Sequence, residues 1–222
     1  GVGTTVITAT QTSSANYTSD TASYTLTVNP LPVTVTPTAT QSKTYGDIDL
    51  TLTYDTTPNG TLSNSSTITF TGSLSRTSGE DVGTYSITIG TLTNTNYDVT
   101  FTEVDYTINQ RPITISADAK TKVYGTTDPS LTYTITAGDI VYGNSVTGVL
   151  TRTAGETAGT YTITQNTLTY GNNYDETYVL DYLTITKATT DVTDGNSATY
   201  TDTTITFGDS DILLTPTSSN TA

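Results

Sequence analysis

The sequence of 222 residues predicts an all-β protein, and two observations carry the prediction. Threonine alternates with apolar residues along many short segments, of which 33–36 (Val-Thr-Val-Thr) and 113–115 (Ile-Thr-Ile) are clear examples. A period of two in β-branched residues is typical of strands with one buried face and one solvated face. The second observation is an internal repeat of fixed spacing, and no segment shows the period of a helix.

The repeat is a short motif that begins with glycine and is followed each time by an Asn-Tyr pair. The glycines are Gly3, Gly83 and Gly159, and the pairs are Asn16-Tyr17, Asn96-Tyr97 and Asn173-Tyr174. The separation from glycine to tyrosine is 14, 14 and 15 residues, and a hydrophobic residue follows each tyrosine after 11 more. Such constant spacing predicts a tandem array of small domains.

The chain begins, at residues 1–29, with the C-terminal half of one repeat. Two strands are predicted here, at 4–11 and 22–29, joined through the loop that carries Asn16-Tyr17. Pro30 and Pro32 mark the junction to the next domain, because proline cannot donate a hydrogen bond to a central strand ladder.

Residues 30–110 form the first complete repeat. Strands are predicted at 33–36, 50–54, 67–70, 73–76, 83–89, 97–102 and 104–109. The strands 73–76 and 83–89 are expected to make a hairpin around a glycine-containing turn, and Pro58-Asn59-Gly60 indicates a second turn.

Residues 111–187 form the second complete repeat, and residues 188–222 the N-terminal half of a further one. Lys122-Val123-Tyr124-Gly125 matches Lys43-Thr44-Tyr45-Gly46 at a distance of 79 residues, and a closing strand is predicted at 183–186. Residues 207–215 align with 45–53. Half a domain cannot cover its apolar face. The two partial ends are therefore expected to be completed by the parent chain on either side, or by each other in donor-strand fashion.

Composition excludes several classes of function. The chain has 7 basic and 21 acidic residues, a net charge of −14, and no Cys, His, Trp or Met. Without Cys and His, most nucleophile–base pairs and the usual zinc ligands are absent, so we expect no enzyme and no cofactor. A nucleic-acid partner is disfavoured because it requires a cationic surface. No segment approaches the roughly 18 apolar residues of a membrane span, and we expect an interior piece of a larger secreted protein.

The repeated motif favours one kind of β fold. Asp81-x-Gly83-x-Tyr85-x-Ile87 resembles the Asp-x-Gly-x-Tyr-x-Cys signature of immunoglobulin domains, in which the tyrosine forms a tyrosine corner. Tyr85 and Tyr161 are the predicted corner residues. We therefore expect tandem Ig-like β-sandwich domains in an elongated rod, with β-grasp-like units as the alternative for the two central repeats.

The central repeats also resemble the MBG family, whose units carry a Tyr-Gly segment, a Leu-Thr-Tyr strand, an Arg-x-x-Gly-Glu turn and a Gly-Thr-Tyr strand. These motifs stand here at 124–125, 131–133, 152–156 and 159–161. The first repeat departs from the second in having Asp49-Leu50 where Asp128-Pro129 stand. The terminal halves, residues 3–28 and 204–217, are similar to bacterial Ig-like repeats of giant Bacteroidota adhesins, of the gliding-motility or biofilm type.

This resemblance implies a location and partners. The chain would lie at the cell surface, associated with the outer membrane through the rest of the parent chain. Its partners would be neighbouring repeats of that chain and a surface polysaccharide, with no membrane insertion. The implied function is a structural stalk segment that extends a binding region away from the cell. The alternative is a carbohydrate-binding or adhesive module that contacts surface glycans.

Two sets of charged residues are candidate sites. Arg76 with Glu80, and Arg152 with Glu156, flank a tight turn and are interpreted as structural ion pairs, with a recognition site as the alternative. Asp47, Asp49, Asp209 and Asp211 are candidate weak calcium ligands, with a role as turn caps as the alternative.

Two further sets concern the surface. Thr21, Thr56 and Thr203 follow an aspartate in a pattern that resembles Bacteroidota O-glycosylation sites, although chance matches are expected in a chain so rich in threonine. Tyr142 and Tyr170 have no counterpart in the other repeat and are the candidate tyrosines for surface contacts.

Overall fold

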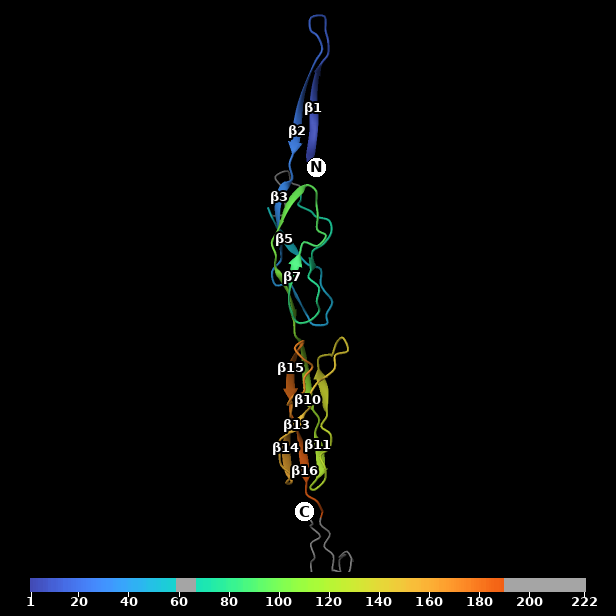
Figure 1. Ribbon diagram of the computed structural model, residues 1–222, viewed down its shortest axis with the longest axis vertical. Coiled ribbons are helices and arrows are strands. Elements are labelled where there is room, and N and C mark those ends of the chain that lie inside the picture. The colour runs from blue at the N-terminus through green and yellow to red at the C-terminus, as the bar shows by residue number, and fades with distance from the viewer. Residues whose placement is uncertain (59–66, 190–222) are drawn as a thin grey trace, which may run out of the picture. The chain divides into compact units, whose positions relative to one another are not determined.

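A computed structural model describes residues 1–58 and 67–189 of the chain. These residues form sixteen strands, β1 to β16, and no helix, which confirms the predicted all-β class (Figure 1). The chain divides into two compact units. Unit 1 comprises Gly1–Arg111 together with Asn172–Tyr174, and unit 2 contains the remaining residues. No helix among the described residues is long and apolar enough to cross a membrane.

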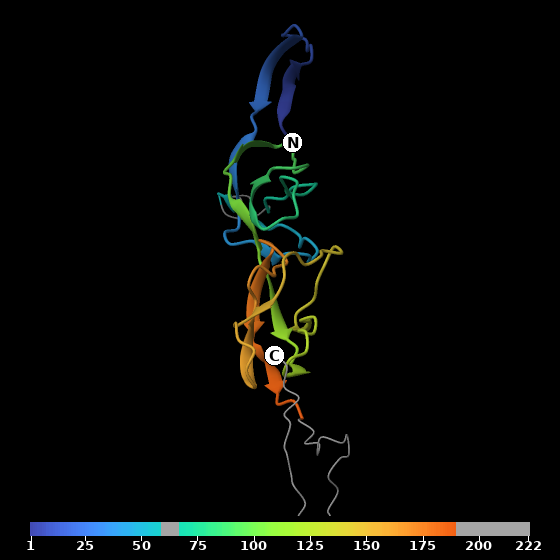
Figure 2. The ribbon, with the colours of Figure 1, turned by 60° about the horizontal axis from the view of Figure 1, so that its bottom comes forward.

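Unit 1 begins with a two-stranded hairpin of β1 (Gly3–Gln11) and β2 (Asp20–Val28), which lie side by side in both ribbon views (Figures 1 and 2). The strands are antiparallel, with Gly3 opposite Val28 and Gln11 opposite Asp20. Every residue of the two strands is exposed. The apolar side chains of the two strands are not covered by any other described element, so the hairpin has no core of its own.

The rest of unit 1 contains two sheets. The three-stranded sheet has the order β5-β3-β8 and the four-stranded sheet the order β4-β9-β7-β6. Their bounds are β3 Leu31–Pro37, β4 Ser42–Thr44, β5 Tyr54–Thr57, β6 Ser75–Arg76, β7 Gly83–Thr88, β8 Tyr97–Phe101 and β9 Asp105–Asn109. The pairs β3–β8 and β4–β9 are parallel, and the other pairs are antiparallel.

The second repeat has the same two sheets, with the orders β12-β10-β15 and β11-β16-β14-β13. Their bounds are β10 Arg111–Ala117, β11 Lys120–Val123, β12 Tyr133–Ala137, β13 Thr151–Arg152, β14 Gly159–Thr164, β15 Tyr174–Val179 and β16 Asp181–Thr186. As in the first repeat, the short strand β11 runs parallel to the closing strand β16.

The core of each repeat follows the alternation in the sequence. In β3, Val33 and Val35 are buried while the threonines between them lie on the other face, and Ile113 and Ile115 of β10 repeat this arrangement. In unit 2, Ala117 of the three-stranded sheet packs with Ile163 and Leu183 of the four-stranded sheet. The two sheets therefore share one hydrophobic core.

Some strands differ from the predicted ones. The strand expected at 50–54 lies instead at Tyr54–Thr57, because the backbone of Thr53 is bonded to a loop: its N–H donates to Gln41 Oε1 and its carbonyl accepts from Thr38 N. The sequence did not indicate β4 and β11, because both are short segments that contain lysine, one in β4 and two in β11. The predicted front half-repeat at 188–222 falls almost wholly outside the described residues, and the predicted domain boundaries stay predictions.

Candidate functional site: a charged cluster in each repeat

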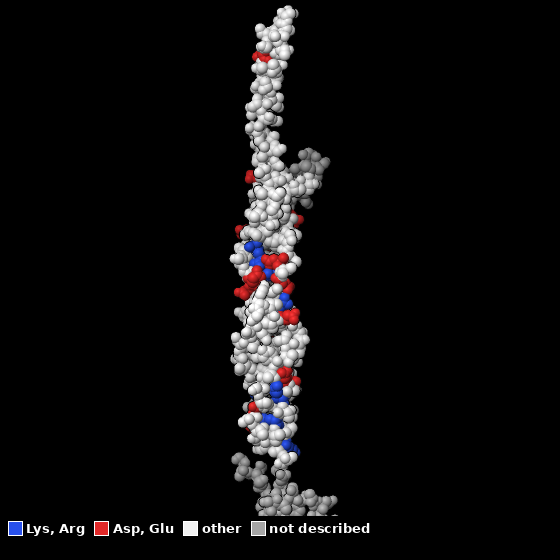
Figure 3. Space-filling view, turned by 90° about the vertical axis from the view of Figure 1, so that its right-hand side faces the viewer, with Lys and Arg blue, Asp and Glu red and all other residues white. Residues whose placement is uncertain are grey.

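Each repeat contains a cluster of two cations and two carboxylates, which we call the charged cluster. In the first repeat it consists of Lys43, Asp49, Arg76 and Glu80, and in the second of Lys122, Asp128, Arg152 and Glu156. The lysine comes from β4 or β11, the aspartate from the loop that follows, the arginine from β6 or β13, and the glutamate from the turn before β7 or β14. On the face drawn in Figure 3, blue Lys and Arg atoms lie beside red Asp and Glu atoms in several places.

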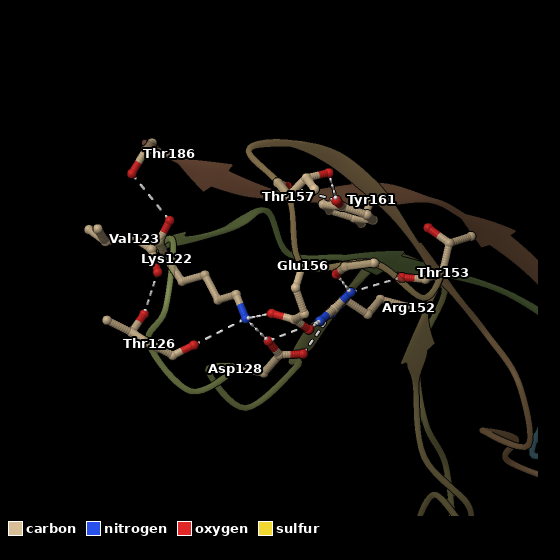
Figure 4. A network of polar contacts seen from close by, with 11 residues as sticks. Lys122, Val123, Thr126, Asp128, Arg152, Thr153, Glu156, Thr157, Tyr161 and Thr186 are labelled. Carbon is tan, nitrogen blue, oxygen red and sulfur yellow. Dashed lines mark hydrogen bonds and ion pairs between the residues drawn. The ribbon is translucent and has the colours of Figure 1, made fainter. Parts of the chain in front are cut away.

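In the second repeat both cations contact both carboxylates (Figure 4). Lys122 Nζ lies 2.6 Å from Asp128 Oδ1 and 2.5 Å from Glu156 Oε2. Arg152 holds Asp128 with two nitrogens, Nε at 2.6 Å from Oδ2 and Nη2 at 3.1 Å from Oδ1, and Nη2 also pairs with Glu156 Oε1. The four charges cancel, and the bidentate geometry is the strong form of an Arg–carboxylate pair.

The first repeat reproduces this geometry. Lys43 Nζ lies 2.7 Å from Asp49 Oδ1 and 2.5 Å from Glu80 Oε2. Arg76 binds Asp49 through Nε at 2.8 Å and Nη2 at 3.1 Å, and Glu80 at 2.7 Å. The structure thus places the predicted pairs Arg76–Glu80 and Arg152–Glu156 in contact, each within a larger set of charges.

The cations of the cluster are buried and the carboxylates are partly exposed. The side chains of Lys43 and Lys122 are only 4% exposed. A buried ammonium group is costly unless its N–H donors have acceptors. All three donors of Lys122 have one, because the ammonium group also donates to the carbonyl of Thr126. Removing either carboxylate would leave a buried cation short of a partner.

The contacts within the cluster shift the pKa of its members toward the charged forms. Hydrogen bonds from Arg152 and then from Lys122 lower the pKa of Asp128 to about 2. Arg76 likewise lowers the pKa of Asp49, and hydrogen bonds from the lysines lower the pKa of Glu80 and of Glu156. Burial acts against the charge of Lys43, but its bonds to Asp49 and Glu80 outweigh it, so that the pKa of Lys43 is raised.

A tyrosine corner lies against each cluster. The Tyr85 hydroxyl donates to the carbonyl of Asp81 at 2.7 Å, and the Tyr161 hydroxyl donates to that of Thr157 at 2.7 Å. Each ring lies under the guanidinium of its cluster, with Arg76 5.1 Å above Tyr85 and Arg152 5.2 Å above Tyr161.

The turn between the arginine and the tyrosine requires glycine. Gly79 and Gly155 have φ of 147° and 144°, and a Cβ at either position would lie 2.2 Å from the ring of the corner tyrosine. Their carbonyls accept 2.6 Å hydrogen bonds from Arg76 Nη1 and Arg152 Nη1. Cluster, turn and corner therefore form one connected arrangement.

Chemically, this arrangement joins the front half of a repeat to its back half. Lys43 and Asp49 precede Arg76 and Glu80 by 27 to 37 residues, and two ion pairs, Lys43–Glu80 and Arg76–Asp49, connect the two halves. Because the chain has no cysteine, no disulfide can make this connection. The motifs Lys-x-Tyr-Gly and Arg-x-x-Gly-Glu each contribute one side of the same cross-link.

The structure separates the two described candidate calcium ligands. Asp47 pairs with Arg111 at 2.5 Å, whereas Asp49 belongs to the charged cluster. Among residues 1–58 and 67–189, no group of three or more carboxylate, His or Cys residues is placed to hold a metal. Asp209 and Asp211 lie outside the described residues.

The other candidate residues are dispersed. Thr21 is exposed on β2, Thr56 is half-buried on β5, and Thr203 lies outside the described residues. Tyr142 is exposed, whereas Tyr170 is half-buried with its hydroxyl 3.2 Å from that of Tyr133.

The sequence did not reveal the roles of three residues. It did not assign the buried lysines Lys43 and Lys122, although their separation of 79 residues equals that of the Tyr-Gly motifs. It also missed Glu176, which accepts hydrogen bonds from Tyr170 N, Thr169 Oγ1 and Gln165 Nε2 and so fixes the loop before β15. No signal marks Glu176 in the sequence, because Val99 stands at the corresponding place in the first repeat.

Comparison with known families gives one result. A family model described as MBG domain (YGX type) matches residues 33–107 and again residues 113–184, about two thirds of the chain. The tripeptides that correspond to YGX are Tyr45-Gly46-Asp47 and Tyr124-Gly125-Thr126, whose glycines both have φ of 85°. No curated protein matches the chain.

Proposed function

The chain belongs to the MBG domain family of the YGX type, and from this premise we propose that it is a stalk segment of a large, repetitive cell-surface adhesin. In this role its two tandem domains, flanked by Ig-like half-repeats, extend a binding region away from an outer membrane. The partners of these domains are neighbouring repeats of the parent chain. The region that binds a ligand lies in another part of that chain.

The observation that carries the proposal is that both repeats have the same charged cluster and the same tyrosine corner. All of these contacts lie within a single repeat and stabilise its fold. A stalk requires such locally stabilised domains, because each unit must stay folded on its own contacts whatever its neighbours do. The two cations of each cluster have their partners within the repeat, and a ligand would have to displace these internal ion pairs.

The surface chemistry supports the same role. A net charge of −14 keeps a long, concentrated surface protein soluble and prevents nonspecific aggregation. Of the two described candidate glycosylation sites, Thr21 on β2 is exposed and Thr56 on β5 is half-buried, so Thr21 is the more accessible for an O-glycan. In intact mass measured on protein from the native host, added hexose that is lost in Thr21→Val would support this modification.

Small-angle X-ray scattering on the full chain tests the stalk. A globule of this length has a radius of gyration of about 17 Å. The proposal expects about twice that value or more, together with no selective binding on a glycan array. A radius near the globular value would contradict the stalk, and selective glycan binding would instead favour a carbohydrate-binding module.

A further inference from the structure

Each repeat begins and ends in strands of different sheets. The first repeat begins with β3, the middle strand of the three-stranded sheet, and ends with β9, an inner strand of the four-stranded sheet. The second repeat begins with β10 and ends with β16, which take the same places in its sheets. Tension along the chain therefore acts on one strand of each sheet, and the partners of these strands determine how the repeat responds.

The opening strand of the first repeat pairs in parallel with a strand near its end. In the pair of β3 and β8, Leu31 lies opposite Tyr97 and Val35 lies opposite Phe101. Leu31 N also donates to Asn96 O at 3.0 Å, which extends the pair by one bond. A short link joins β8 directly to the closing strand β9. Tension along the chain therefore pulls β3 at its N-terminal end and β8 at its C-terminal end.

The four-stranded sheet contains a second pair of this kind. β4 runs parallel to β9, with Thr44 opposite Asn109, and Tyr45 N extends the pair by donating to Asn109 O at 2.8 Å. In the second repeat β11 runs parallel to β16, and Tyr124 N donates to Thr186 O at 2.8 Å. In both repeats an early strand is thus bonded to the strand through which the chain leaves the repeat.

Parallel strands that are pulled at opposite ends are loaded in shear. All the bonds between the two strands then resist the load together, because they can break only when the strands slide past each other. Strands that are pulled at the same end are unzipped instead, and their bonds break one after another. Forced unfolding is governed by the barrier to unfolding, so the same pair should withstand more force in shear than in unzipping.

Side chains oppose the same sliding motion. Val33 and Val35 of β3 are 1% and 0% exposed, and a shift of one residue along β8 would turn both out of the core. Lys43 of β4 lies opposite Ile108 of β9, and its ammonium group is held by Glu80 in the turn before β7. β4 therefore cannot slide along β9 without breaking an ion pair whose cation is buried.

We propose that each repeat is a load-bearing domain, which resists tension along the chain because its early and closing strands are paired in parallel. The pairs β3–β8 and β4–β9 carry the load in the first repeat, and the pair β11–β16 does so in the second. The function is mechanical and belongs to the strand pairing within a single repeat. It therefore depends neither on the stalk role nor on what flanks the two repeats.

The direction of pulling tests the proposal, because one and the same pair can be loaded in shear or unzipped. The chain contains no cysteine, so two introduced cysteines are unique attachment points for single-molecule force measurements on the full chain. Asn29→Cys with Lys187→Cys is the shear variant, in which both repeats are pulled along the chain. Asn29→Cys with Thr95→Cys is the unzipping variant, in which β3 and β8 are pulled at the same N-terminal end. All three positions are exposed.

The two variants should unfold at different forces when they are pulled at the same rate. Each of the two unfolding events of the shear variant should require at least about twice the force that opens the first repeat in the unzipping variant. Circular dichroism and urea titration without force are the control. Both variants should match the wild type there, so that a difference in force reports the direction of the load alone.

Equal unfolding forces in the two variants would overturn the proposal, and so would a lower force in the shear variant. Such a result would leave the stalk proposal intact, because scattering measures the dimensions of the chain and not its resistance to load. Conversely, a radius of gyration near the globular value would contradict the stalk without changing the expected ratio of forces.

Discussion

Arg76 and Asp49 are 27 residues apart in the chain and meet in a bidentate ion pair, with Nε 2.8 Å from Oδ2 and Nη2 3.1 Å from Oδ1. Asp49 lies in the loop after β4, and Arg76 ends β6. Their contact closes the first repeat across its front and back halves. Arg152 and Asp128 do the same in the second repeat, 24 residues apart.

Replacement of Arg76 by lysine should destabilise the protein although it keeps the charge. A lysine cannot contact Asp49 through two nitrogens and also donate to the carbonyl of Gly79. We expect the free energy of unfolding of the first repeat to fall by about 1–2 kcal/mol in urea titrations followed by circular dichroism. Lys187→Arg, at an exposed position, is the control and should leave unfolding unchanged. Equal stability of Arg76→Lys and wild type would show that the two-nitrogen contact of the guanidinium with Asp49 does not stabilise the repeat.

Acid should weaken the second repeat through Asp128. The pKa of this carboxyl is lowered from 3.8 to about 2 in the folded state, first by Arg152 and then by Lys122. Because the folded pKa is the lower one, the carboxylate stabilises the fold above pH 3.8, and this contribution is lost as the pH falls toward about 2. Asp128→Asn should be less stable than wild type near pH 6 and should lose less stability across the acid range.

Urea unfolding at a series of pH values measures this difference. Asp139→Asn, at an exposed position in the same repeat, serves as the control and should follow the wild-type curve. If Asp128→Asn and wild type kept a constant difference from neutral pH down to about pH 2, the assignment to Asp128 would fail.

Two tyrosine hydroxyls of the first repeat should have opposite effects on stability. Among the described residues, the Tyr106 hydroxyl is the one buried side-chain polar atom without a hydrogen-bond partner, and burial raises its pKa. Tyr106→Phe should therefore stabilise the first repeat by about 1 kcal/mol. Tyr85→Phe removes the bond to the carbonyl of Asp81 and should cost about 1 kcal/mol. The pair is its own control, and the same sign for both variants in chemical denaturation would contradict the structure.

Gly79→Ala should be more damaging than a substitution at another glycine with positive φ. At Gly79 an added Cβ would lie 2.2 Å from the ring of Tyr85, whereas at Gly171, with φ of 93°, it would meet nothing within 4 Å. Gly171→Ala therefore reports backbone strain alone, at about 1 kcal/mol, and the excess loss in Gly79→Ala reports displacement of the corner. Differential scanning calorimetry measures the loss of stability in both variants. Equal losses would mean that the ring of Tyr85 can move away from the added Cβ without destabilising the protein.

Much of the fold could be predicted, because its signals are local. The alternation around Val33 and Ile113 predicted which side chains are buried, and the Gly-x-Tyr motif singled out Tyr85 and Tyr161, whose hydroxyls both donate to a backbone carbonyl four residues earlier. The buried Lys43 could not be predicted, since a lysine within a threonine-rich segment has the appearance of a solvated strand residue. Its burial depends on Glu80, 37 residues further on, and such distant pairings leave no period in a single sequence.

In the candidate site, too, contacts between residues close in sequence could be predicted and contacts between distant residues could not. Arg76 and Glu80 are four residues apart, so their contact across the turn could be inferred. Asp49 was considered as a calcium ligand beside Asp47, but the fold turns it toward Arg76 and Lys43 while Asp47 contacts Arg111. Asp47 lies in the turn after β4 and Asp49 in the loop that follows, where no strand period fixes the direction of a side chain, so the sequence does not say which cation each carboxylate contacts.

A double-mutant cycle on Arg76 and Asp49 tests most directly whether the charged cluster is the internal cross-link of a repeat. The free energy of unfolding is measured for wild type, Arg76→Met, Asp49→Asn and the double variant. The account predicts that the two losses are not additive, with a coupling energy of about 1 kcal/mol or more in favour of the pair. A coupling energy within about 0.3 kcal/mol of zero would contradict it, because the two halves of the repeat would then be held together by other contacts.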